Sequence, residues 1–234
     1  MVNRQGRDPH LGYLALAGCL LAGLCFAVVL TIDAAPSSGD TSAVASAAGG
    51  GQSHQHVVGL ASEIPITDRE TRRLLADQLA AARRSVRGIH TTADARAHGY
   101  LPATVDLGYL GVHYLNPELA AKPFGPARPT HLIFDQDNAQ GRLVGLMYYV
   151  DNKGGAPEGF AGPNDVWHTH SAACMSSGIM VALDDISSAQ CSKLGGAMTP
   201  LGRRFDNRWM LHVWVVPGEE NPWGTFADGD PVLA

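Results

Sequence analysis

Two of the ten histidines stand in a pattern that suits metal binding. His168 and His170 are separated by one residue in the segment DVWHTH, which covers residues 165–170. On an extended strand, alternate side chains point to the same face, so the two rings would lie about 6.6–7 Å apart along the chain. That spacing allows two imidazoles to converge on one ion. The pair is therefore the first candidate for a metal site.

Two further histidines fall within apolar strand patterns. His212 lies in RWMLHVWVV (208–216), and His113 lies in GYLGVHYL (108–115). Each also fits a buried histidine that is satisfied by hydrogen bonds alone. Three imidazoles from neighbouring strands, with a fourth position open, are typical of a catalytic zinc or copper site. The predicted metal ligands are His168, His170, His212 and His113.

Sulfur-bearing side chains follow the histidine pair. Cys174 comes four residues after His170, and Met175 and Met180 lie just beyond it. Such soft ligands favour copper or zinc over magnesium or calcium. Cys174 can equally form a disulfide with Cys191, the usual state of two cysteines in an oxidising compartment, which would contribute about 3 kcal/mol. The two interpretations exclude each other, and we favour the disulfide.

A carboxylate and three other histidines lie near these segments. Asp165 could accept a hydrogen bond from a ligating imidazole and orient it, as second-shell carboxylates do. It is equally a loop aspartate beside a turn. We expect His131, at the start of its strand, and His90 and His98, near helix ends, to lie at the surface.

The sequence patterns around these residues predict an α+β fold that would position them. Two N-terminal helices are followed by a mainly antiparallel β-sheet or open barrel. The first helix should begin at a capping box of Thr67 with Glu70, and the second should begin at Thr91 or Thr92 and end at Gly99. Residues 208–216 are apolar on both faces, which is typical of a central strand. The segment 171–201 is ambiguous, with a short helix expected within 184–194. Strand patterns cover residues 108–115, 130–135, 142–151, 165–170 and 208–216.

The N-terminal part of the chain predicts export. Residues 11–32 carry no charge, and as a helix they would extend about 33 Å, enough to cross a membrane. Arg4 and Arg7 lie in residues 1–10 and predict that this end stays in the cytoplasm. We expect an uncleaved signal anchor; a cleaved signal peptide and lipidation at Cys19 remain alternatives. Residues 33–57, rich in Ala, Ser and Gly, predict a flexible linker, and residues 58–234 an extracytoplasmic domain.

Six short motifs lie between Ala93 and the end of the chain. They are A-x-x-x-G-Y (95–100), G-x-H-Y-x-N (111–116), P-x-x-L-I-F (129–134), G-x-L-V-G (141–145), LHVW (211–214) and NP-x-G-x-FA (221–227). In these motifs the chain resembles an uncharacterised family of bacterial secreted or membrane-anchored proteins. The resemblance implies that His113 and His212 belong to one shared group of residues, but it implies no established activity.

The predicted function is a membrane-anchored extracytoplasmic protein with a histidine-based zinc or copper site, for metal binding and handling or for metal-dependent catalysis. Whether it is an enzyme stays open. The alternative is a metal-free small-molecule or protein-interaction domain of the cell envelope. A net charge of −5 argues against nucleic acid as the main partner.

Overall fold

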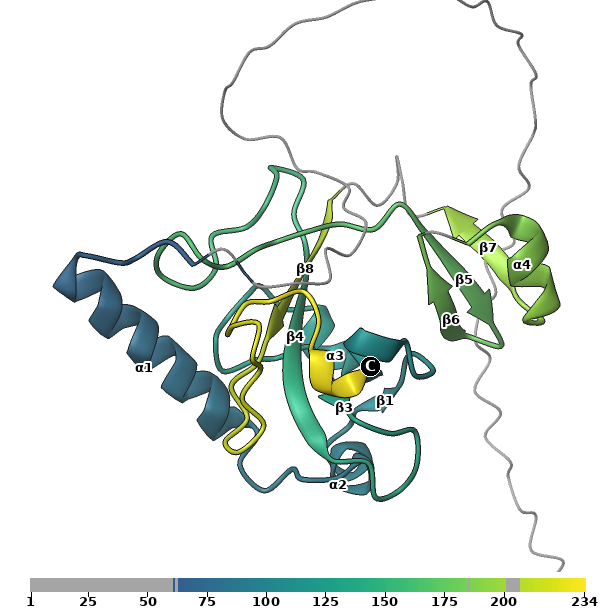
Figure 1. The fold of residues 1–234 in the computed structure, drawn as a ribbon, viewed down its shortest axis with the longest axis horizontal. Coiled ribbons are helices and arrows are strands. Elements are labelled where there is room, and N and C mark those ends of the chain that lie inside the picture. The colour runs from purple at the N-terminus through teal and green to yellow at the C-terminus, as the bar shows by residue number, and fades with distance from the viewer. Residues whose placement is uncertain (1–60, 62, 185, 201–206) are drawn as a thin grey trace, which may run out of the picture. The chain divides into compact units, whose positions relative to one another are not determined.

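The computed structural model describes residues 61, 63–184, 186–200 and 207–234, and these residues form an α+β domain with antiparallel sheets (Figure 1). The predicted fold class is confirmed at this level. The helices are α1 (Arg69–Ser85), α2 (Thr92–Ala97), η1 (Gly108–Leu110), α3 (Pro117–Ala120), α4 (Ser188–Lys193) and η2 (Pro231–Leu233). The strands are β1 (Leu101–Pro102), β2 (Val112–Leu115), β3 (His131–Phe134), β4 (Leu143–Asp151), β5 (Ala172–Ser176), β6 (Ile179–Leu183), β7 (Ala197–Pro200) and β8 (Arg208–Val213).

The two N-terminal helices begin with different caps. The predicted capping box of Thr67 with Glu70 is wrong, because Asp68 is the N-cap of α1 and its carboxylate accepts a hydrogen bond from the Thr71 backbone N–H at 2.6 Å. A charged acceptor at this end is also favoured by the helix dipole. Helix α2 begins as predicted at Thr91, which forms a capping box with Asp94.

The larger sheet has five strands in the order β1-β2-β3-β4-β8, with antiparallel pairing throughout. The prediction of a central strand in 208–216 is wrong, because β8 is the last strand of this order. Its edge is partly covered by the segment before β5. There the backbone N–H of His168 donates to Met210 at 3.0 Å, and the N–H of Met210 donates to His168 at 2.8 Å. One face of β8 is nevertheless buried through Trp209, Leu211 and Val213, and on the other face Met210 is partly buried and His212 is buried, which explains the apolar pattern.

The segment 165–170 forms no regular strand. Its pairing to β8 is the isolated bridge between His168 and Met210. A chain that touches a sheet edge at one position cannot form a ladder, although it stays extended there. The predicted alternation still brings the rings of His168 and His170 together, with centroids 5.1 Å apart.

Alternation along the strands separates the main core from the histidines. One face of the five-stranded sheet packs with Ala82 of α1, with Val86 just after this helix and with neighbouring residues into the main core. The intervening residues point to the opposite face. The core side comprises Val112, Tyr114, Leu132, Phe134, Leu146, Tyr148, Leu211 and Val213, and the opposite side carries His113, His131, Met147 and His212.

The ambiguous segment 171–201 forms a second sheet, in the order β6-β5-β7, and the short helix α4. Cys174 of β5 and Cys191 of α4 form a disulfide with a Cα–Cα distance of 5.6 Å, and both residues are fully buried. The predicted disulfide is confirmed, so Cys174 does not serve as a thiolate ligand. Backbone hydrogen bonds between Met180 of β6 and residues 103 and 105 join this sheet to the chain after β1.

The predicted anchor, 11–32, and the linker, 33–57, lie outside the described residues. Within the part of the chain that the structure describes, no helix is long and apolar enough to span a bilayer.

Candidate metal centre

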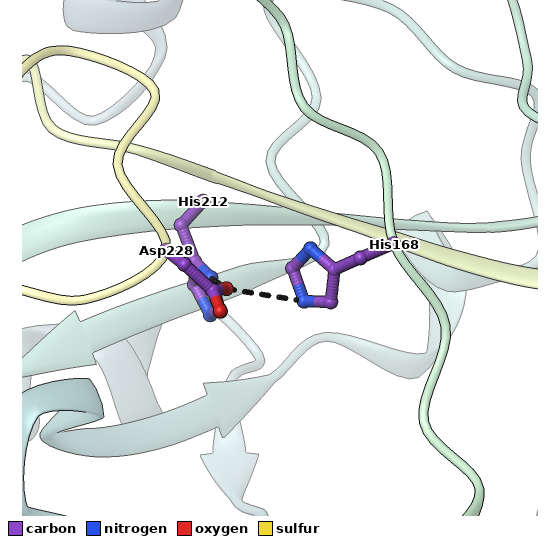
Figure 2. A group of neighbouring side chains, drawn as sticks. All are labelled: His168, His212 and Asp228. Carbon is purple, nitrogen blue, oxygen red and sulfur yellow. Dashed lines mark hydrogen bonds and ion pairs between the residues drawn. The ribbon is translucent and has the colours of Figure 1, made fainter. Parts of the chain in front are cut away.

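Three segments far apart in the sequence bring potential metal ligands together. His168 comes from the segment bridged to β8, His212 from β8 itself, and Asp228 from the loop between β8 and η2. One ligand atom from each lies within 4.8 Å of the other two (Figure 2). Both histidines are buried, and the Asp228 side chain is mostly buried. A buried cluster of two imidazoles and one carboxylate could hold a metal ion.

The distances to Asp228 fit ligands of one ion. Its Oδ1 lies 3.4 Å from His168 Nε2 and 3.3 Å from His212 Nδ1. Charge-assisted N–H···O bonds are usually about 2.7–2.9 Å long. By contrast, two ligands about 2.05 Å from a tetrahedral ion are about 3.3 Å apart. The contacts are therefore long for hydrogen bonds and close to the separation that one ion would impose.

Each ring also has a polar atom near its other nitrogen. His168 Nδ1 lies 3.4 Å from the Val166 carbonyl oxygen, and His212 Nε2 lies 3.3 Å from His113 Nε2. Ligating histidines generally donate their second N–H to a carbonyl, a carboxylate or water, which fixes the ring orientation. The Val166 carbonyl is an acceptor of this kind at a long distance, whereas the direction of the contact between the two histidines depends on their tautomers.

His113, a predicted ligand, lies next to the cluster. In a flat sheet β2 and β8 would be separated by three strand spacings, about 14 Å, so the rings of His113 and His212 must converge over the sheet to reach 3.3 Å. Gly145 of β4 permits the packing beneath, because a Cβ there would lie 2.7 Å from the ring of Trp214. Trp214 in turn stacks on His212 with centroids 6.2 Å apart.

His170, the other predicted ligand, is held by Asp184. Its Nδ1 lies 2.7 Å from Asp184 Oδ2, while Asp184 Oδ1 accepts hydrogen bonds from Ser171 and from the Ala172 N–H. Burial alone would raise the pKa of the Asp184 carboxyl, but the hydrogen bond and charge of His170, with these other donors, hold the pKa well below its usual range. The His170 ring is therefore fixed by Asp184 through Nδ1, and His170 is not among the three residues of the cluster.

His131 is buried, so the prediction that it lies at the surface is wrong. It is the first residue of β3, between β2 and β4, and its ring lies against those of His113 and Tyr149, with centroids 6.2 and 6.3 Å away. Burial, with a smaller contribution from the charge of His212, lowers the pKa of His131 to about 3, so the ring is neutral at physiological pH. His90 and His98 are exposed as expected.

Of the two interpretations of Asp165, the loop aspartate agrees with the structure. Asp165 accepts hydrogen bonds from the Phe160 N–H and the Trp167 indole N–H, at 3.0 and 3.1 Å, instead of orienting a histidine. Burial raises the pKa of Asp165 to about 6 despite these bonds. Sequence reasoning missed Asp228, which lies 16 residues after His212 in a loop. The available signal was an acidic residue directly after the NP-x-G-x-FA motif.

A cavity of about 650 Å³ adjoins the cluster on the histidine face of the sheet. Its walls combine residues of both sheets, including Met147, Met180 and Met210, and the rings of His170 and His212 face it. His212 is therefore shared between the cluster and the cavity. An ion bound there would lie next to a chamber large enough for a small molecule.

Searches of protein-family models, curated proteins and solved structures find no significant match to this chain. The resemblance described from the sequence motifs stays a prediction.

Proposed function

We propose that this chain is an extracytoplasmic protein, anchored by residues 11–32, whose domain binds one zinc ion through His168, His212 and Asp228. The observation that carries the proposal is the pair of distances, 3.4 and 3.3 Å, from Asp228 Oδ1 to the two ring nitrogens. They match the ligand separation of a tetrahedral ion. In this proposal His113 orients His212, and His170 lies beside the ion on the cavity side.

The donor set favours zinc over copper. Two imidazoles and one carboxylate are the protein ligands of one common class of catalytic zinc site, which keeps the fourth position for water. The disulfide removes the Cys174 thiolate, a soft ligand that suits both metals, so the choice rests on the nitrogen and oxygen donors. Zinc lowers the pKa of a bound water to about 7, so a site of this kind supports hydrolysis as well as metal handling.

Metal analysis of the full chain tests the proposal. The protein is produced without a histidine tag and its metals are measured by mass spectrometry, as purified and after incubation with Zn²⁺ or Cu²⁺. We expect about one zinc per chain in the wild type, and loss of most of it in His168→Ala and Asp228→Asn. His90→Ala replaces an exposed histidine and serves as the matched control, with unchanged zinc.

Three results would contradict the proposal. A wild type that stays metal-free after incubation would favour the metal-free binding domain. Zinc that survives in both His168→Ala and Asp228→Asn would place the ion elsewhere. Stoichiometric copper or iron in place of zinc would overturn the choice of metal, since two histidines and a carboxylate also serve iron.

The location needs its own test. Spheroplasts of bacteria that express the full chain should lose the domain to added protease while a cytoplasmic marker is retained. Substituting arginines for Leu20 and Leu21 should abolish this exposure, because charges in the apolar segment oppose membrane insertion. A domain that is protected from protease in intact spheroplasts would refute the extracytoplasmic location.

A further inference from the structure

The cavity beside the histidine cluster has the size and walls of a ligand site. At about 650 Å³ it falls in the range of small-molecule pockets, which are mainly apolar with a few polar groups that fix orientation. Most of its lining residues are apolar, and they come from β1, β2, β4, β5, β6 and β8 and from residues 103–120. An apolar body would therefore leave water on entering it.

Methionines make this wall adaptable. Met147, Met175, Met180 and Met210 all line the cavity. Methionine is unbranched and polarizable, and it is common at surfaces that accept differently shaped apolar partners. Such a lining can adapt to apolar ligands of different shapes.

The charged groups of the lining have one sign. Among the described residues that line the cavity there is no aspartate or glutamate, whereas Arg208 lies on it, with its guanidinium over the Tyr149 ring at 5.7 Å. Asp151, the residue opposite Arg208 on β4, lies outside the lining. Arginine keeps its charge at all physiological pH values and binds carboxylates with two parallel hydrogen bonds. The polar end of a ligand should therefore be anionic.

We propose that this cavity binds an amphipathic monocarboxylic acid, with the alkyl chain or ring system among the methionines and leucines and the carboxylate at Arg208. The binding does not depend on the proposed zinc ion. Neither His168 nor Asp228 lines the cavity, and Arg208 lies on the same strand as His212, four residues earlier.

Binding of decanoate to the full chain in phospholipid nanodiscs tests this proposal by equilibrium dialysis, with empty nanodiscs subtracted. We expect one saturable site per chain. Decanol and decyltrimethylammonium, which share the chain length but lack the negative charge, should bind at least tenfold more weakly.

Two pairs of variants test the apolar cavity and the Arg208 contact separately. Leu115→Trp fills the cavity from β2 and should weaken decanoate binding at least tenfold, whereas Leu74→Trp, at an exposed position of α1, should leave it unchanged. Arg208→Gln should weaken decanoate about tenfold and leave decanol unaffected, and Arg208→Lys should restore most of the loss. Circular dichroism verifies that each variant is folded.

Several outcomes would overturn the inference. Equal decanoate binding by the wild type and a folded Leu115→Trp would mean that the lipid or the outer surface takes up the probe. Equal binding by the wild type and Arg208→Gln would refute the anionic anchor, and so would decanol binding as tightly as decanoate. Chelation by EDTA separates this proposal from the zinc site. Decanoate binding should persist after metal removal. Its loss would mean that the metal ion, and not Arg208, holds the carboxylate.

Discussion

Replacing both Cys174 and Cys191 with alanine should lower the free energy of unfolding by about 3 kcal/mol. The disulfide joins residues 17 positions apart. In the chain-entropy description, closing that loop removes about 10.5 cal/mol/K from the unfolded chain, which at 25 °C gives the stated free energy. Since 1 kcal/mol corresponds to about 2–4 °C for a domain of this size, the melting temperature should fall by about 6–12 °C.

Thermal unfolding followed by tryptophan fluorescence measures this change, because Trp167, Trp209 and Trp214 are buried at the larger sheet and report its unfolding. The matched control is chemical reduction. A thiol reductant present during unfolding should bring the wild type down to the level of the double alanine variant and leave that variant unchanged. Thiol labelling without reductant should likewise leave both cysteines unmodified in the wild type.

A loss of less than about 1 kcal/mol, with the wild type insensitive to reductant, would refute the reasoning. It would mean that the bridge does not restrain the unfolded chain as the loop length requires. A much larger loss of the free energy of unfolding, together with loss of the metal, would show that the second sheet supports the histidine cluster. The chain-entropy argument does not include such a coupling.

Three further substitutions test individual contacts. Gly145→Ala should lower the free energy of unfolding, measured by urea denaturation, by about 1–3 kcal/mol and should weaken zinc binding. The reason is that the added Cβ would displace Trp214, which stacks on His212. An unchanged free energy of unfolding with an unchanged zinc affinity would contradict that packing. Asp165→Asn should stabilise the domain by about 1 kcal/mol at pH 7, after allowance for partial exposure, and have little effect at pH 3. The pKa of Asp165 is about 6 in the folded state, above its unfolded value. The wild type is therefore most stable when this carboxyl is protonated, and it loses stability as the pH rises from about 4 to 6. Identical urea midpoints of wild type and variant across that pH range would refute the raised pKa. Asp184→Asn should lower the free energy of unfolding by about 2 kcal/mol at neutral pH, because it replaces a charged acceptor of several hydrogen bonds. The difference between wild type and variant should shrink as the pH falls below about 4, because the lowered pKa of Asp184 stabilises the folded state only while the carboxyl is ionised. A difference that stays constant down to pH 2 would contradict this.

Much of the candidate site follows from local sequence patterns. One-residue spacing predicted that His168 and His170 point to one face, and their ring centroids lie 5.1 Å apart. Apolar strand patterns marked His113 and His212 as buried candidates for the same site, and their Nε2 atoms lie 3.3 Å apart. The disulfide followed from two cysteines in an expected oxidising compartment. These features depend on backbone geometry over a few residues, which a single sequence reveals.

The remaining features depend on contacts between distant segments. Asp228 approaches His212 because a loop folds back over β8, and no periodicity predicts a loop path. The edge position of β8 and the burial of His131 both result from the order of strands in the sheet, which apolar patterns do not determine. Asp68 replaced Thr67 as the helix cap because neighbouring polar residues offer competing caps within one turn.

The location of the metal ion is the central claim, and anomalous diffraction tests it most directly. Crystals of the zinc-loaded protein, measured on both sides of the zinc absorption edge, should show one strong peak about 2.0–2.2 Å from His168 Nε2, His212 Nδ1 and Asp228 Oδ1. A peak at another group of residues, or no peak from protein saturated with zinc, would contradict the account.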